Sequence, residues 1–160
     1  ESIAALQVPS GQIPWFPGGH CDPWNHVETA MALDTGRIFV SNERSHDIWV
    51  FSPDYEHIAT IETSRRPRDM RLNADRTLLY VACGDDDVID IIDVDTLEVV
   101  DSIPTGPSPE VFAFSPDESL IYVSNEEDSM LEIIEADSRI VVAISRTAAI
   151  SMSPAIPTAT

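Results

Sequence analysis

Residues 110–144 decide the fold, and they read EVFAFSPDESLIYVSNEEDSMLEIIEADSRIVVAI. This stretch contains four apolar runs of strand length, and polar or turn-forming residues separate each run from the next: 111–114, 120–123, 131–134 and 140–144. Four short strands in so compact a segment predict one antiparallel meander.

The same pattern occurs three times along the chain. An aspartate is followed five residues later by an aromatic residue in the pairs Asp34 and Phe39, Asp75 and Tyr80, and Asp117 and Tyr122. A period near 40 residues with four strands per repeat is the signature of a β-propeller blade. We therefore expect an all-β fold, a partial β-propeller of three four-stranded antiparallel blades at residues 27–64, 67–105 and 109–147.

The repeat cores read FVSN at 39–42, YVAC at 80–83 and YVSN at 122–125. They resemble the YVTN-type β-propeller repeat, a WD40-like fold, over residues 27–147, with Ala82-Cys83 as a departure from the pattern. Members of that family include archaeal surface-layer proteins and exported bacterial propellers, some associated with quinone-cofactor enzymes. The resemblance implies a surface or periplasmic location, and it is specific for fold and not for activity, because one fold hosts many functions.

The chain of 160 residues is strongly acidic, with a formal net charge of −19 from 28 acidic and 9 basic residues. All the basic residues are arginine. Such a field repels nucleic acid and anionic membrane surfaces, so we expect neither as a partner. Two origins of this composition remain open, a halophile surface kept soluble in high salt and a genome rich in G and C.

The apolar runs and the cysteines say little more about the class of protein. No apolar run approaches the roughly 18 residues that a membrane helix needs, so we expect no membrane insertion. Cys21 and Cys83 lack a motif spacing, so the sequence decides neither a disulfide nor a compartment.

The two ends of the chain fall outside the repeat. Residues 1–26 are rich in glycine and proline and predict an irregular N-terminal segment. Residues 26–33 favour a helix by composition, whereas the repeat register makes them the first strand of the first blade. The phrase PWFPGGHCDPWNHVETAMAL at 14–33 also resembles a segment of prenyltransferase-like α/α-barrel proteins. Residues 148–160 are either a tail or the start of a truncated fourth blade.

An arginine cluster lies where the second repeat begins, and Arg66, Arg68 and Arg71 are its candidate ligand-binding residues. In a propeller the start of a first strand lies near the central channel, where guanidinium groups suit a small anionic ligand such as a carboxylate or phosphate. The alternative is that these arginines pair with neighbouring carboxylates of a very acidic protein.

Two further groups of residues are candidate metal sites. His20, Cys21, Asp22 and His26 have ligand chemistry, but their spacing matches no established motif. Asp85-Asp86-Asp87 lacks the DxDxDG pattern of a calcium loop and occupies a hairpin-turn position of the repeat. We therefore expect turns at both places and neither a metal nor another cofactor.

One repeat position in the third strand holds Trp49, Asp90 and Glu132. Because a polar side chain here alternates with apolar neighbours, the pattern predicts a blade face that water reaches.

The sequence contains no GxSxG, HExxH, P-loop, GxGxxG or haem-attachment CxxCH motif. We therefore expect a non-enzymatic binding or interaction module, a fragment or oligomerising part of a larger propeller, with a protein partner or self-association. One alternative is the propeller portion of a quinoprotein-type redox assembly, and another is a fragment of a prenyltransferase-like enzyme.

Overall fold

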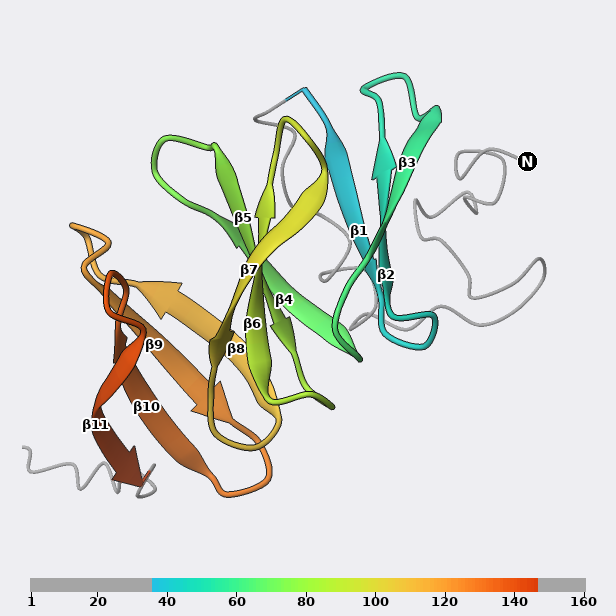
Figure 1. Cartoon of the computed structure of the whole chain (residues 1–160). Coiled ribbons are helices and arrows are strands. Elements are labelled where there is room, and N and C mark those ends of the chain that lie inside the picture. Colours follow the sequence, from blue (N-terminus) through green and yellow to red (C-terminus); the bar gives the residue numbers. More distant parts are fainter. Residues whose placement is uncertain (1–35, 147–160) are drawn as a thin grey trace, which may run out of the picture.

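The computed structural model describes residues 36–146, and these form strands and turns with no helix among them. The strands make three antiparallel sheets that stand side by side in chain order (Figure 1). The all-β class predicted from the repeat is confirmed, and the three sheets fit a partial β-propeller.

We call the three sheets blades 1, 2 and 3. Blade 1 contains β1 (Ile38–Asn42), β2 (Asp47–Phe51) and β3 (His57–Glu62). Blade 2 contains β4 (Pro67–Leu72), β5 (Leu78–Cys83), β6 (Val88–Asp93) and β7 (Glu98–Pro104). Blade 3 contains β8 (Pro109–Phe114), β9 (Leu120–Asn125), β10 (Met130–Glu135) and β11 (Ile140–Arg146).

Each blade is a simple meander in which consecutive strands pair. Blade 1 shows three strands, because the expected first strand at 28–33 lies outside the described residues. Three further predictions also concern residues outside the described range: helix or strand at 26–33, the irregular segment 1–26 and the tail 148–160.

The turns repeat as faithfully as the strands. A residue with positive φ ends the turn between the second and third strands of every repeat, and these residues are His46 (61°), Asp87 (58°) and Ser129 (55°). Each such turn also carries at least one acidic residue, so we call 43–46, 84–87 and 126–129 the acidic turns. The repeat period therefore places three carboxylate-bearing turns at one end of the blades.

The apolar core lies between the blades. One cluster joins blade 1 to blade 2 and contains Phe39, Ile48, Val50 and Ile61 together with Met70, Leu79, Val81 and Ile92. A second cluster joins blade 2 to blade 3 and contains Ala82, Ile89, Ile91 and Ile103 together with Phe112, Ile121, Val123 and Ile134. Because successive side chains of a strand point to opposite faces, each blade has a front face toward the following blade and a back face toward the preceding one.

Candidate functional site

Two short linkers join the blades, residues 63–66 and 105–108, and they lie against the acidic turns. In the first linker, the Thr63 backbone N–H donates to the His46 carbonyl oxygen at 3.0 Å, and the Arg66 N–H donates to His46 Nδ1 at 3.0 Å. On its other side, the Gly84 N–H donates to the Arg66 carbonyl oxygen at 2.9 Å. The linker is thus held between the acidic turns of blades 1 and 2.

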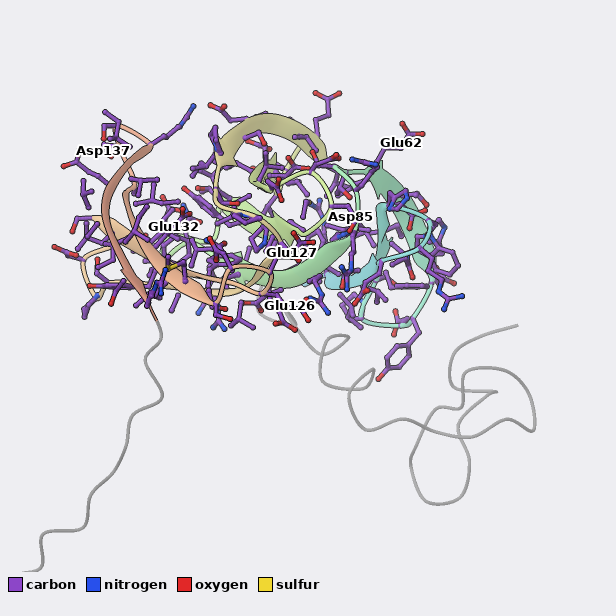
Figure 2. The ribbon with its side chains drawn as sticks, turned by 90° about the horizontal axis from the view of Figure 1, so that it is seen from below. Glu62, Asp85, Glu126, Glu127, Glu132 and Asp137 are labelled. Atoms are coloured by element: carbon purple, nitrogen blue, oxygen red, sulfur yellow. The ribbon has the colours of Figure 1, made fainter. Side chains whose placement is uncertain are left out.

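The second linker repeats this arrangement one blade further on. The Thr105 N–H donates to the Asp87 carbonyl oxygen, the Ser108 N–H donates to Asp87 Oδ1, and the Glu126 N–H donates to the Ser108 carbonyl oxygen, each at 2.9 Å. We call the surface formed by the two linkers and three acidic turns the linker face. Figure 2 views the blades from this side and labels Asp85, Glu126 and Glu127 there.

Arg66, at the end of the first linker, lies between two carboxylates. Its Nε is 3.5 Å from Glu43 Oε2 and its Nη1 is 3.5 Å from Asp85 Oδ1, so it bridges the acidic turns of blades 1 and 2. Burial by itself lowers the pKa of Arg66, but the charges of Glu43 and Asp85 outweigh it and leave the pKa raised. This guanidinium is therefore held firmly in its charged form.

The adjacent Arg65 has one strong partner. Its Nη2 is 2.6 Å from Asp86 Oδ1, and its backbone N–H donates to Asp86 Oδ2 at 2.6 Å. The hydrogen bonds from Arg65 lower the pKa of Asp86. Asp87 accepts from Ser108, as described above, so Asp86 and Asp87 of the triple aspartate both bind linker residues. No group of three or more metal-ligating side chains occurs within residues 36–146, and the candidates His20, Cys21, Asp22 and His26 lie outside them.

Arg68 on β4 contacts carboxylates of both other blades. Its side chain is 13% exposed, and its nitrogens lie 3.6 Å from Glu43 Oε1 in blade 1, 3.3 Å from Glu110 Oε1 and 3.0 Å from Glu126 Oε2 in blade 3. Three carboxylates around one largely buried cation give a network that is worth more than an isolated surface pair. Arg68 therefore ties the three blades together beneath the linker face.

Arg71 is paired separately from the other two arginines. Its Nε is 3.1 Å from Asp69 Oδ2, and its guanidinium carbon lies 5.9 Å from the centre of the Phe112 ring on β8. Asp69 Oδ2 also accepts from the Phe112 backbone N–H at 3.2 Å. Arg71 and Asp69 thus form a contact between the first strands of blades 2 and 3.

The structure therefore brings Arg66 and Arg68 together around Glu43 and engages all three candidate arginines with carboxylates. This arrangement matches the alternative in which the arginines pair with neighbouring carboxylates. Anion binding by these residues stays a prediction, and it would require an incoming anion to compete with carboxylates that are already in place.

Sequence reasoning missed a buried carboxylate behind the first linker. Asp90 on β6 is 1% exposed and accepts four hydrogen bonds, three from N–H and O–H donors and a weaker one from a thiol. The Ser64 backbone N–H donates to its Oδ2 at 2.7 Å, and the hydroxyls of Ser64 and Ser102 donate to its Oδ1 at 3.1 and 3.0 Å. Asp90 thereby clamps the linker that enters its own blade.

Glu132 on β10 plays the same part in blade 3, where it is 6% exposed and its Oε2 accepts from the Gly106 N–H at 2.7 Å. Gly106 stands where the first linker has Ser64. A Cβ at Gly106 would meet Asn125 Nδ2 at 2.6 Å and Glu132 Oε1 at 2.8 Å, so the longer glutamate is matched by a linker residue without a side chain.

The prediction that water reaches the blade face at this repeat position is therefore wrong for blades 2 and 3. Both carboxylates are buried because a linker N–H, which needs an acceptor, lies directly over them. Blade 1 differs, because Trp49 at the matching position is 43% exposed and makes edge contacts with the rings of Phe51 and His57.

Cys83 lies beside this clamp as a free, fully buried thiol. Its Sγ donates to Asp90 Oδ2 at 3.6 Å. Burial, together with the negative charge of Asp90, raises the pKa of the thiol well above its usual range. Because the thiolate is the reactive form, Cys83 is a packing residue in this environment and not a nucleophile.

The fold has counterparts among solved structures. Hydrazine synthase from Kuenenia stuttgartiensis matches 74% of this chain with a TM-score of 0.66 and 20% identity. A putative 6-phosphogluconolactonase from Bacteroides fragilis matches 68% with a TM-score of 0.58 and 22% identity. The dihydro-heme d1 dehydrogenase NirN, in complex with DHE, matches 82% with a TM-score of 0.57 and 22% identity.

These neighbours are propeller-type folds, so a partial β-propeller is the architecture of the described residues. The chain spans only 34%, 34% and 25% of their respective lengths. At such identities the likeness extends to the fold alone, and the resemblance to the YVTN repeat stays a prediction from the sequence.

Sequence comparison adds one short match and no family. No family model matches the chain. A curated protein from Mycolicibacterium hassiacum, MMP endo-(1,4)-3-O-methyl-alpha-D-mannosidase, is 67% identical over 33 residues, which is 21% of this chain and 9% of that protein. The match is too short a part of either protein to assign this chain to the family. Within residues 36–146, no helix is long and apolar enough to cross a membrane.

Proposed function

We propose that the three blades form a non-enzymatic interaction module, a part of a propeller that binds a protein partner or another copy of itself. The observation that carries this proposal is the use of the charged groups at the linker face. Arg66 and Arg68 are paired with carboxylates of neighbouring blades, and Asp90 and Glu132 are bound to linker N–H groups.

This arrangement differs from that of a catalytic centre. A catalytic acid, base or nucleophile must reach a substrate, and its pKa is usually tuned toward the working pH. Here Asp90 and Glu132 are covered by linkers, while the thiol of Cys83 is shielded and has a raised pKa. The described ionisable groups thus support scaffolding of the blades and leave recognition to exposed surfaces.

An activity screen tests the proposal. The purified full chain is assayed against generic ester, phosphate-ester and quinone-linked dye substrates, and we expect no turnover. The matched variants are His46→Ala and Asp87→Ala, because each residue accepts hydrogen bonds from a linker at the linker face, His46 from the first linker and Asp87 from the second. Turnover that disappears in either variant would contradict a non-enzymatic role.

The alternative is a propeller portion of a redox assembly. Two of the matched structures are named for redox-related proteins, hydrazine synthase and a dihydro-heme d1 dehydrogenase. The fold is therefore compatible with this alternative. Titration of the full chain with haem and with a soluble quinone, followed by absorbance, separates the two ideas. A saturable spectral shift at one equivalent would favour the redox alternative over the interaction module.

A further inference from the structure

The two contacts between blades are built from the same repeat positions. The front face of blade 1 uses Phe39, Ile48, Val50 and Ile61, and the front face of blade 2 uses the matching Tyr80, Ile89, Ile91 and Ile103. Their partners on the back faces also match, because Leu79, Val81 and Ile92 of blade 2 correspond to Ile121, Val123 and Ile134 of blade 3. One interface design is therefore used twice within this chain.

The front face of blade 3 carries the same kind of surface without a cover. Leu131 and Ile133 correspond to Ile89 and Ile91, which are fully buried, yet both are only partly buried. Val111 on β8 of the same face is largely exposed. This face lies at one end of the row of sheets, on the far side of blade 3 from blade 2 (Figure 1).

The back face of blade 1 carries the complementary half of the same interface. Ile38, Val40 and Phe51 occupy the positions of Leu79, Val81 and Ile92, and Ile38 and Val40 are only partly buried where their counterparts are fully buried. The strands that carry them, β1 and β2, belong to blade 1, which lies at the opposite end of the row from blade 3 (Figure 1). The two ends of the described fold are thus the two halves of one contact.

Trp49 indicates what kind of neighbour the back face of blade 1 meets. In blades 2 and 3 the matching position is a carboxylate, and that carboxylate binds the N–H of the linker that comes from the preceding blade. Blade 1 has an indole ring at this position instead of a carboxylate, so a neighbour can pack against it without supplying a hydrogen-bond donor. An indole ring suits a contact between separate molecules, where aromatic residues are enriched.

We propose that the front face of blade 3 binds the back face of blade 1 of a second copy of this chain, in a head-to-tail contact. The inference rests on the proposed function and names the partner. A head-to-tail contact closes into a ring when the rotation fits and otherwise continues as an open assembly. The occupant is a second copy because the chain itself carries both halves of the interface.

The test uses the full chain and two variants that each damage one half. Leu131→Asp places a charge on the front face of blade 3, and Trp49→Asp places one on the back face of blade 1, where neighbouring blades already tolerate a carboxylate. Val100→Asp is the control, because Val100 is 53% exposed on the outer strand β7, away from both halves. Circular dichroism establishes that each variant keeps the β-sheet signal.

Sedimentation velocity over a range of concentrations reports the association. We expect the unmodified chain and Val100→Asp to self-associate, and each of the two interface variants alone to associate at least about tenfold more weakly. An equimolar mixture of Leu131→Asp and Trp49→Asp should recover a heterodimer, because one undamaged contact remains between the two variants.

Three outcomes overturn the proposal. An unmodified chain that stays monomeric shows that the ends do not bind each other. Loss of association in Leu131→Asp but not in Trp49→Asp shows a symmetric contact between two copies of blade 3. Failure of the mixture to associate shows that the two faces are not partners. A monomer without turnover would leave the non-enzymatic proposal standing, whereas an associating chain with turnover would overturn that proposal and not this one.

Discussion

Replacing Asp90 with alanine should destabilise the fold more than any single surface change, because it removes the acceptor that holds the first linker. Four donors lose their partner: the Ser64 backbone N–H, the hydroxyls of Ser64 and Ser102, and the thiol of Cys83. The side chain is almost completely buried, so water cannot replace the lost acceptor without opening the contact between blades 1 and 2.

The magnitude follows from the three hydrogen bonds from N–H and O–H groups, because the thiol of Cys83 is a weak donor. A backbone N–H left buried without an acceptor costs about 1–3 kcal/mol, and each hydroxyl, which can rotate toward another acceptor, adds about 0.5–1.5 kcal/mol. Removal of a buried charge offsets part of this loss. The net expectation is about 3 kcal/mol of unfolding free energy, or a melting temperature lower by roughly 10 °C for a domain of this size.

Urea denaturation followed by circular dichroism measures this change, with the full chain as the reference. Glu98→Ala is the matched control, because Glu98 is an exposed carboxylate on the same blade, and its removal should stay within about 0.5 kcal/mol. Asp90→Asn should lie between the two, since its amide retains one acceptor but turns a donor toward the Ser64 region. A loss of less than about 1 kcal/mol for Asp90→Ala would refute the view that this carboxylate clamps the linker.

Three further outcomes can be measured with the same equipment. Gly106→Ala should cost about 1–3 kcal/mol because its Cβ would approach Asn125 Nδ2 to 2.6 Å, whereas Gly84→Ala, whose nearest contacts are at 3.6 Å, should be much milder; equal losses would contradict this. Hydrogen bonds from Ser115 and Ser119 lower the pKa of Asp117 to about 2, so its contribution is complete above the unfolded pKa near 4 and is lost as pH falls toward 2. Asp117→Asn should therefore flatten the acid limb of a stability–pH curve, and an unchanged limb would exclude this role. Because the net charge is −19, melting temperature should rise from low to molar KCl, and a flat or falling response would count against self-repulsion.

The sequence predicted the fold class because every level of the repeat agrees. The apolar alternation, the turn residues and the period all indicate four-stranded meanders, and the third strand of blade 3, expected at 131–134, is β10 (Met130–Glu135). Local signals of this kind depend on residues within one strand or one hairpin. They are readable without knowledge of how the blades pack.

The site was less predictable because its contacts join residues far apart in the chain. Ser64 binds Asp90, Arg68 binds Glu126, and neither spacing belongs to a motif. A signal was nevertheless present in the repeat alignment, where a serine in the linker goes with an aspartate and Gly106 goes with the longer glutamate. Such paired changes in size indicate contact between a linker and a strand.

The polar clamps explain how blades with such similar apolar faces keep one relative position. Apolar burial is non-directional, so the faces alone would allow one blade to slide along another. A linker N–H bound to Asp90 or Glu132 has only one geometry in which its distance is satisfied, and Arg68 adds carboxylates from both flanking blades. The back face of blade 1 has Trp49 in place of the carboxylate, so this position offers no acceptor for such a clamp. Under the head-to-tail proposal, a second copy bound there would be held mainly by apolar burial, which favours a reversible contact over one with the fixed position of the blades within the chain.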